Sequence, residues 1–447
     1  MSDRQKWPVG EVPGPNARQL VTRSEQAVSP SLPRAYPLAV KRGQGMMIED
    51  MDGNLFLDCA AGIAVCSTGH CHPRVVKAIQ DQAERLLHIC GADFYDPIYI
   101  GLAERLAKLA PGGDSKRVFL ANSGAEAVEA ALKLARHHTG RPRVVAFFGA
   151  FHGRTMGAVS LTASKSVYQG GFGPLVPGIA HVPYAYCYRC AYNLTYPECD
   201  LACVDYIEDM LFARSFPADE VAAIFVEPVQ GEGGYIIPPP SWISRLRALC
   251  DKYGILLIAD EVQSGIGRTG RIFAIEHWDV EPDIICSAKA LASGMPVSAM
   301  IAREEVMNWP AGAHGSTFGG NPVCCAAAMA TLDVIEEEHL MENATQVGGR
   351  LLANLQDLAQ ESQLIGDVRG LGLMIGVELV LDQETKARAK EQVDQVIEEC
   401  FKRGLLLLSC GPNSIRFSPP LIISESQADT AFEIFAEALK QVEGRTQ

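Results

Sequence analysis

Two polar residues that follow apolar segments of the sequence could carry covalent chemistry. Lys289 comes shortly after the apolar segment Asp283–Cys286 and is surrounded by small residues, so we expect it in a tight, partly desolvated place. Burial lowers the pKa of a lysine and makes its amine a usable nucleophile. Asp260 directly follows the apolar segment Ile255–Ala259, and ligands of open α/β sheets bind at the carboxyl ends of strands, so the two side chains should converge. The ordinary alternatives are a lysine in a solvated loop and an aspartate that caps the next helix.

Other segments offer an anion site and an aromatic face. Ser123-Gly124-Ala125 joins a predicted strand to a predicted helix, where backbone N–H groups favour an anion, although Ser123 could simply cap the helix. The glycine-rich turn His314–Pro322 could also bind a phosphate, and Phe151-His152-Gly153-Arg154 supplies a flat ring and a cation. An anion site, a lysine nucleophile, a carboxylate and an aromatic ring are the set that pyridoxal 5′-phosphate (PLP) requires.

The elements that must position these residues alternate between helices and short apolar segments from about residue 75 to 330. Helices are expected at Ala125–His138 and Pro240–Tyr253. Continuous apolar segments of this length are typical of strands covered on both faces. The predicted strands are Arg117–Ala121, Arg143–Phe148, Ala222–Val226, Ile255–Ala259, Asp283–Cys286 and Val297–Ala302. This pattern predicts an α/β domain around a mostly parallel sheet.

The two ends of the chain follow a different pattern. Residues 45–58 predict two short strands joined at Asp52-Gly53, a strong hairpin signal. After about residue 335 we expect a smaller α+β domain, which this hairpin could join. Its predicted elements are a helix at Thr345–Ser362, strands near Leu373–Leu379 and Leu405–Ser409, and a final helix at Ser426–Val442. The predicted domains are therefore 1–74 (arm and hairpin), 75–334 (large domain) and 335–447 (small domain).

Composition excludes some classes of function. The chain has 447 residues and a net charge of −14, which argues against a nucleic-acid partner because phosphate backbones need clustered Lys and Arg. The polar, Pro/Gly-rich segment 1–16 lacks the apolar region of a signal peptide, and no stretch suits a membrane span, so we expect a cytoplasmic protein. No G-x-G-x-x-G follows the first strand, which argues against a NAD-dependent dehydrogenase.

Taken together, these motifs resemble the class III (ω-type) aminotransferases of PLP fold type I, which include 4-aminobutyrate, ornithine and acetylornithine aminotransferases. The resemblance runs from about residue 35 to 440. It implies PLP as cofactor and a large domain with a mostly parallel sheet, plus a smaller α+β domain formed by the N- and C-terminal segments. Its motifs are Asn122–Glu126, Phe151–Arg154, Glu227–Gly234, Asp260–Gly265, Gly267–Gly270, the Lys289 segment and Gly315–Pro322.

The resemblance also implies roles for individual residues. Lys289 would be the Schiff-base lysine and proton carrier, and Asp260 would pair with the pyridinium nitrogen. The other implied cofactor contacts are Ser123, Gly124 and Ala125 at the phosphate, Phe151 and Val262 on the ring faces, Gln263 at the ring hydroxyl, His152 and Glu227 in the same site, and Thr317 at the phosphate of a neighbouring subunit. A homodimer or a dimer of dimers is therefore expected, with no catalytic metal.

Four further residues would decide the substrate. Arg154 resembles the residue that binds the distal carboxylate of 4-aminobutyrate, Arg416 resembles an α-carboxylate ligand, and Glu232 resembles the carboxylate that pairs with that arginine. Ile63 matches a position that is Ile in 4-aminobutyrate enzymes and Tyr in ornithine enzymes. Residues 290–293 depart from the Gly-rich sequence that often follows the lysine in this family, which leaves the substrate open.

The predicted reaction is transfer of an amino group from an ω-amino acid to a keto acid such as 2-oxoglutarate, in a ping-pong sequence. The alternatives on the same scaffold are an ornithine or acetylornithine aminotransferase and an amino-acid racemase. Labelled nitrogen that moves to a keto acid would distinguish a transferase from a racemase.

A cysteine cluster stands apart from this chemistry. Cys187, Cys190, Cys199 and Cys203 have the spacing C-x₂-C-x₈-C-x₃-C. Zinc, an iron–sulfur cluster, disulfides and free thiols all remain open from the spacing alone. We expect the cluster to be structural, because PLP chemistry already has its full set of groups.

Overall fold

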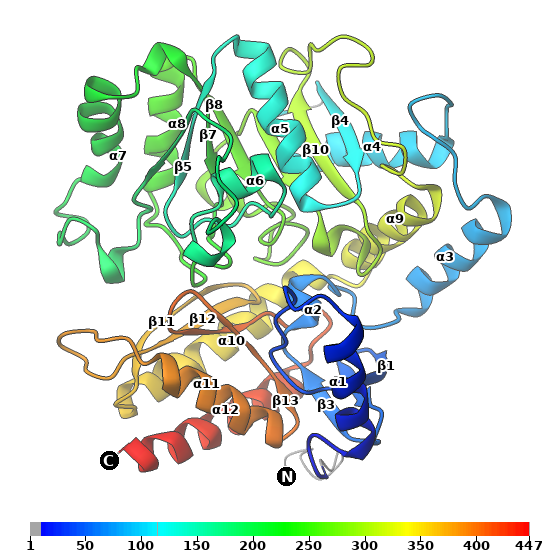
Figure 1. Cartoon of the computed structure of the whole chain (residues 1–447), viewed down its shortest axis with the longest axis vertical. Coiled ribbons are helices and arrows are strands. Elements are labelled where there is room, and N and C mark those ends of the chain that lie inside the picture. The colour runs from blue at the N-terminus through cyan, green and yellow to red at the C-terminus, as the bar shows by residue number, and fades with distance from the viewer. Residues whose placement is uncertain (1–9, 114, 447) are drawn as a thin grey trace. The chain divides into compact units, whose positions relative to one another are not determined.

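The computed structural model describes residues 10–113 and 115–446. Contacts within the chain divide it into two compact units (Figure 1). The central unit comprises Pro73–Met341, and the terminal unit joins the chain up to His72 with the chain from Glu342 onward. No helix in the described part of the chain is long and apolar enough to cross a membrane.

The central unit is built on a seven-stranded sheet (Figure 1). Its strand order is β4 (Lys116–Ala121), β10 (Ser298–Arg303), β9 (Ile284–Ser287), β8 (Leu256–Asp260), β7 (Val221–Val226), β5 (Arg143–Phe147) and β6 (Ile179–Val182). Strand β10 is antiparallel to both of its neighbours, and the other adjacent pairs are parallel. Strands β4, β9, β8, β7 and β5 therefore end at the same edge of the sheet. The six predicted strands are confirmed, whereas β6 was not predicted.

Helix α5 (Gly124–Thr139) shows why this sheet is closely covered. The buried side of the helix is dominated by alanines, which allow its backbone to approach the strands. The helix begins at a capping box formed by Ser123 and Glu126 and ends at Gly140, whose φ of 67° suits a glycine. All six residues of β7 are buried, so both faces of the sheet are covered at its centre.

The remaining helices of the central unit surround this sheet. Helix α8 packs on β8 and α7 packs on α8, while α9 packs on α3 and α4. The predicted helix at 240–253 begins two residues later than expected, because Pro238, Pro239 and Pro240 precede it. The bounds are α3 (Pro73–Arg85), α4 (Pro97–Leu109), α6 (Met156–Leu161), α7 (Ala202–Tyr206), α8 (Trp242–Tyr253) and α9 (Pro322–Glu337).

The terminal unit contains two four-stranded sheets. The first has the order β1 (Val40–Gln44), β2 (Met47–Asp50), β3 (Leu55–Asp58) and β13 (Leu405–Leu406), and β13 joins β3 in parallel, so both ends of the chain share this sheet. The second has the order β11 (Ile365–Leu371), β12 (Met374–Leu379), β15 (Ser414–Phe417) and β14 (Leu408–Cys410). The helices are α1 (Pro15–Ala27), α2 (Ala61–Ala64), α10 (Leu340–Glu361), α11 (Lys390–Lys402) and α12 (Glu425–Thr446).

The predicted hairpin is confirmed at β2 and β3. Asp50 Oδ1 accepts hydrogen bonds from the backbone N–H groups of Asp52, at 2.9 Å, and Asn54, at 2.8 Å, which closes the turn. The predicted helices at 345–362 and 426–442 correspond to α10 and α12, but both are longer than expected. Strand β11 and helix α11 were not predicted.

Adjacent glycines in α10 allow a matched test of this packing. A Cβ added to Gly348 would lie 2.1 Å from the backbone oxygen of Gly372, whereas one added to Gly349 would meet nothing within 4 Å. Gly348→Ala should therefore lower the free energy of unfolding by about 1–3 kcal/mol. Gly349→Ala should raise it by up to about 1 kcal/mol, because alanine favours a helix. Urea unfolding measures both, and equal effects of the two variants would contradict this packing.

Candidate active site

The loops that follow five parallel strands carry the residues expected at the cofactor. Ser123 follows β4, Phe151 follows β5, Glu227 follows β7, Asp260 ends β8, and Lys289 follows β9. Residues Asp260 and Cys286 are paired in register between β8 and β9, so the aspartate and the lysine segment lie on neighbouring strands. The strand order thus arranges all five positions along the carboxyl edge of one sheet.

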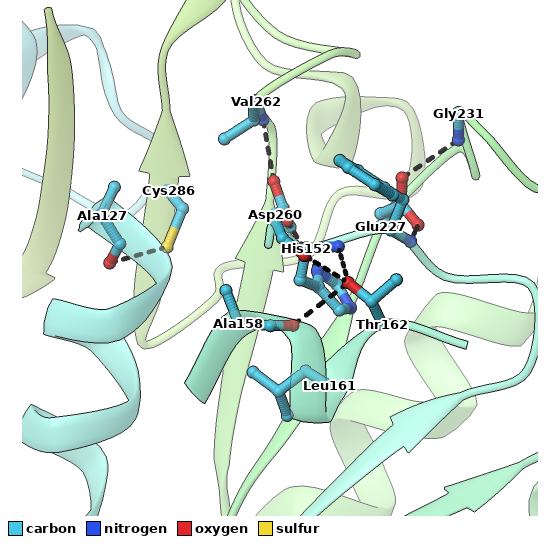
Figure 2. A network of polar contacts seen from close by, with 12 residues as sticks. Ala127, His152, Ala158, Leu161, Thr162, Glu227, Gly231, Asp260, Val262 and Cys286 are labelled. Atoms are coloured by element: carbon cyan, nitrogen blue, oxygen red, sulfur yellow. Dashed lines mark hydrogen bonds and ion pairs between the residues drawn. The ribbon is translucent and has the colours of Figure 1, made fainter. Parts of the chain in front are cut away.

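The centre of this edge is a buried pair formed by Asp260 and His152 (Figure 2). Asp260 Oδ2 lies 2.6 Å from His152 Nδ1, and both residues are buried. Asp260 Oδ1 accepts a hydrogen bond from the N–H of Val262 at 3.0 Å, and Thr162 Oγ1 accepts one from the N–H of His152 at 2.9 Å. Each oxygen of the Asp260 carboxylate is therefore held by a hydrogen bond, and the side chain does not cap a helix.

The electrostatics of the pair favour a charged imidazole. Burial alone would lower the pKa of His152, but its hydrogen bond to Asp260 and the negative charges of Asp260 and Glu227 outweigh burial and raise that pKa. His152 Nε2 is buried and has no hydrogen-bond partner in the described part of the chain. A buried charge is tolerated only when it is paired, so the charged form of His152 depends on the carboxylate of Asp260.

Glu227 is a second buried carboxyl beside this pair (Figure 2). Burial raises its pKa to about 7, and the charge of Asp260 acts in the same direction, while His152 opposes it. Its oxygens accept hydrogen bonds from the N–H groups of Phe151, at 3.1 Å, and Gly231, at 3.0 Å. Glu227 therefore ties the loop after β5 to the loop after β7.

Three glycines allow the loops of the site to pack directly against one another. An added Cβ on Gly124 would lie 2.8 Å from Val262 Cγ1, and one on Gly231 would lie 2.3 Å from Gln263 Nε2. Gly153, with φ of 131°, leaves no room for a Cβ beside Ala125. The loops after β4, β5, β7 and β8 therefore form one contiguous surface.

Some backbone N–H groups at the start of α5 are used in capping, and others are open to an anion. Glu126 Oε2 accepts hydrogen bonds from the N–H groups of Asn122, at 2.6 Å, and Ser123, at 2.9 Å, and the Ser123 hydroxyl accepts one from the Glu126 N–H. The N–H groups of Gly124 and Ala125 have no acceptor in the described part of the chain. These two groups, at the positive end of the helix dipole, are the ones suited to a phosphate.

Lys289 occupies a strained backbone position. Its φ is 42°, in the left-handed region, at the start of a short 3₁₀ segment, Lys289–Ala292, that follows β9. A non-glycine residue there costs of order 1–3 kcal/mol and persists only where the surroundings enforce it. Buried residues flank the half-buried lysine on both sides, which is consistent with a side chain held for function.

A group of five side chains surrounds the loop after β5, and we call it the rim cluster: Phe151, Arg154, Lys165, Tyr168 and Glu232. The guanidinium of Arg154 stacks on the rings of Tyr168, at 4.9 Å, and Phe151, at 5.8 Å. Glu232 Oε1 lies 2.6 Å from Lys165 Nζ and accepts a hydrogen bond from Tyr168 at 3.3 Å. Lys165 and Tyr168 were not predicted from the sequence.

The remaining predicted residues are Thr317, Gln263, Ile63 and Arg416, of which Gln263 belongs to the loop after β8 that packs on Gly231. Thr317 is exposed in the loop that precedes α9. Gln263 Oε1 accepts a hydrogen bond from the hydroxyl of Tyr235 at 2.9 Å. Ile63 and Arg416 belong to the terminal unit, where Ile63 is exposed with φ of 69° and Arg416 is buried in β15. A β-branched residue with positive φ is rare, so Ile63 is also a strained position.

The four clustered cysteines line one small cavity together with several tyrosines of the same segment. All four are free thiols. Burial raises the pKa of Cys187, and it raises the pKa of Cys203 to about 11, so both are neutral at pH 7. No group of three or more metal-ligating side chains in the described ranges is arranged to hold a metal ion. The structural role stays a prediction.

Comparison with known proteins identifies the family. The sequence profile described as Aminotransferase class-III matches residues 29–439. The chain belongs to the class III aminotransferases. It is 41% identical to an alanine/serine racemase of Pyrococcus horikoshii, over 96% of this chain and 91% of that protein. It is also 41% identical to a probable 4-aminobutyrate aminotransferase of Bacillus subtilis, over 90% of this chain and 93% of that protein.

Solved structures support the same assignment. A PLP-bound amine transaminase from an uncultivated Pseudomonas species matches with a TM-score of 0.84 and 34% identity, over 92% of this chain and 95% of that one. The predicted family, fold type and cofactor are thereby confirmed, and this class III aminotransferase depends on PLP.

The residues present at the edge fit PLP. The open N–H groups of Gly124 and Ala125 suit its phosphate, the paired carboxylate of Asp260 suits its pyridine nitrogen, and Lys289 supplies an amine. Val262 and Phe151 offer apolar surfaces suited to its ring. Because position 124 is a glycine, no side chain lies between the start of α5 and Val262.

Glu261, next to Asp260, gives a stability prediction. It is buried, Ile275 N donates to it at 2.7 Å and Ser264 Oγ at 2.5 Å, and burial raises its pKa from 4.5 to about 7. A carboxyl with a raised pKa in the folded state contributes stability that is complete below pH 4.5 and is lost as the pH rises through about 7.

Without cofactor, the Glu261→Gln variant should therefore lose less stability than the wild type as the pH rises from 5 to 8. The rise of the Glu261 pKa from 4.5 to about 7 corresponds to a change of at most about 3 kcal/mol in the free energy of unfolding. Thermal midpoints measured across that pH range test this expectation, with the exposed Glu384→Gln as control. A wild-type pH profile retained by Glu261→Gln would show that this carboxyl titrates normally.

Proposed function

We propose that this enzyme transfers the amino group of an ω-amino acid with a distal carboxylate, such as 4-aminobutyrate, to a keto acid such as 2-oxoglutarate in a ping-pong sequence. The observation that carries the proposal is Arg154. Two aromatic rings orient its guanidinium, and it has no ion pair in the described part of the chain. Such a guanidinium is suited to a bidentate bond with a carboxylate. The 4-aminobutyrate aminotransferase among the relatives and the isoleucine at position 63 support the same substrate class.

Asp260 and His152 would control the protonation of the cofactor's ring nitrogen. PLP supplies an electron sink for the carbon that bears the amino group. Asp260 would keep the ring nitrogen protonated, and a carboxylate does this only while it stays ionised. His152, bonded to Asp260 Oδ2 at 2.6 Å, would hold that carboxylate in place beside the ring nitrogen.

Lys289 would hold the cofactor through its amine and then act as the base. Once released by the incoming amino donor, its amine would take the proton from the amino-bearing carbon. Arg154 would fix the far end of the substrate, so that this carbon and not another is presented to Lys289. Arg416 would serve the α-carboxylate of the keto acid in the second half of the sequence, and Thr317 would contact the phosphate of a partner subunit in a homodimer.

An amino-acid racemase is the second candidate, because a racemase is as similar to this chain as the aminotransferase is. Racemisation would need the same lysine and aspartate, but the amino group would stay on its carbon. Incubation of ¹⁵N-labelled amino donor with unlabelled 2-oxoglutarate distinguishes the two. With 4-aminobutyrate the transferase proposal requires ¹⁵N in glutamate, whereas inversion of a chiral donor such as L-alanine without ¹⁵N in glutamate would favour the racemase.

Lys289→Ala should abolish amino-group transfer and the absorbance band of lysine-bound cofactor while the fold remains intact. Loss of the amine removes both the covalent link and the base. Absorbance spectra, borohydride reduction followed by peptide mapping, and circular dichroism measure the three properties. Lys77→Ala, at an exposed lysine of α3, is the control. A borohydride-stable PLP adduct in Lys289→Ala would assign the Schiff base to another lysine.

Arg154→Lys should raise the KM for 4-aminobutyrate by roughly tenfold or more, because a lysine cannot reproduce the bidentate fork. The kcat should change little, since the contact is distant from the reacting carbon. A panel of amino donors with 2-oxoglutarate as acceptor makes the measurement, and Arg117→Lys, at an exposed arginine, is the control. Much faster turnover of ornithine or of α-amino acids by the wild type would overturn the proposed substrate class.

A further inference from the structure

Glu129, a residue of α5, is bonded to the segment that carries Arg154. Its Oε1 accepts three hydrogen bonds, from the hydroxyl of Thr155 at 2.6 Å, the N–H of Gly157 at 2.8 Å and the N–H of Ala158 at 3.2 Å. Thr155 directly follows Arg154 and is the N-cap residue of α6, but its own side chain does not cap that helix. The carboxylate of Glu129 therefore caps α6 from a neighbouring helix.

The same segment touches α5 at a second point. Gly153 has φ of 131°, and a Cβ added to it would lie 2.7 Å from the Cβ of Ala125. Ala125 and Glu129 are four residues apart in α5, so they lie on the same side of that helix. Arg154 thus lies between two points at which its segment is fixed to α5.

Helix α5 connects these two points to the open N–H groups at its start. The N–H groups of Gly124 and Ala125 suit the phosphate of PLP, and they belong to the first turn of the same helix. A helix rises by about 1.5 Å per residue, so the spacing between this turn and Glu129 is set by the helix itself. The backbone of Arg154 is therefore held in a fixed place relative to the N–H groups that suit the phosphate.

Glu129 fixes the backbone of Arg154 without occupying its guanidinium. No ion pair joins the two residues in the described part of the chain, and the guanidinium stacks on the rings of Phe151 and Tyr168. Hydrogen bonds from N–H groups to a carboxylate are stronger than those to a neutral oxygen. A glutamine at this position should keep the same geometry with weaker bonds, whereas an alanine should lose it.

We propose that Glu129 is a positioning residue that determines which length of amino donor the enzyme accepts. The inference rests on the proposed function, in which Arg154 binds the distal carboxylate of an ω-amino acid. The amino-bearing carbon of the donor must also reach Lys289. With both ends of the site held in place, only donors whose carbon chain spans the distance between them bind productively, so a shift of Arg154 changes the preferred number of methylene groups.

The test compares 4-aminobutyrate with 5-aminovalerate, which is one methylene longer, as donors to 2-oxoglutarate with the PLP-loaded enzyme. Glu129→Ala should move the ratio of the two kcat/KM values toward one by roughly fivefold or more, through a higher KM for the preferred donor with little change in kcat. Glu129→Gln should retain most of the wild-type ratio, because an amide oxygen accepts the same bonds. His137→Ala, at an exposed residue later in α5, is the control and should keep the wild-type ratio.

A double variant separates positioning from a general loss of folding. Arg154→Met removes the carboxylate ligand, so the addition of Glu129→Ala to it should raise neither KM further. Additive effects of the two changes would show that Glu129 supports the fold as a whole, and they would overturn the inference. A ratio that Glu129→Ala leaves unchanged would overturn it, and so would a wild-type ratio near one, because no donor length would then be selected.

Failure of the proposed function gives a different result. If Arg154→Met uses 4-aminobutyrate as well as the wild type does, or if the wild type uses neither donor, Arg154 is not the carboxylate ligand and both proposals fall. If Arg154→Met raises the KM and Glu129→Ala changes neither the KM nor the ratio, only the role of Glu129 is wrong.

Discussion

The buried ion pair between Asp260 and His152 is the constraint on which the rest of the central unit depends. An ionised carboxylate at the end of a fully buried strand is costly unless a partner compensates it. That partner comes from the loop after β5, and β7 lies between β5 and β8, so the strand order must be correct before the pair can form. Glu227, at the end of β7, links the two sides by accepting bonds from the N–H groups of Phe151 and Gly231.

The same constraint explains why this edge contains costly features. Glu227 and Glu261 are buried carboxyls whose pKa values are raised to about 7, and Lys289 has an unfavourable φ. Each lowers the stability of the folded protein at neutral pH relative to an apolar or relaxed alternative. A large alanine-lined core between α5 and the sheet can offset such costs, so functional groups can remain at the edge in conformations that they would not adopt alone.

The sequence was sufficient to predict the features that depend on local pattern. Continuous apolar segments marked six strands of the central sheet, and the residues that follow them identified the carboxyl edge where Asp260 and Lys289 lie. Strand β11 escaped prediction because charged residues and glycines interrupt it. Helix α11 could have been predicted, because its buried apolar residues Val393, Val396, Ile397 and Cys400 recur at helical spacing. The ion pair of Lys165 with Glu232 could not be predicted, because it joins two loops 67 residues apart whose meeting is decided by the packing of other residues.

The chain is as similar to a racemase as it is to an aminotransferase. The roles proposed for the residues at this edge of the sheet are compatible with both reactions. Both reactions need an electron sink, a charged partner for the ring nitrogen and a lysine that moves a proton, so Asp260, His152 and Lys289, in the roles proposed for them, would not distinguish the two reactions. The distinction would come from groups that bind the rest of the substrate, and the group proposed for that role in the central unit is Arg154, which belongs to the rim cluster. Its charge is set by three side chains, Arg154, Lys165 and Glu232, only one of which lacks an ion pair in the described ranges. Under the proposed function, a change at Arg154 would therefore alter which substrates bind without any change to the groups that do the chemistry.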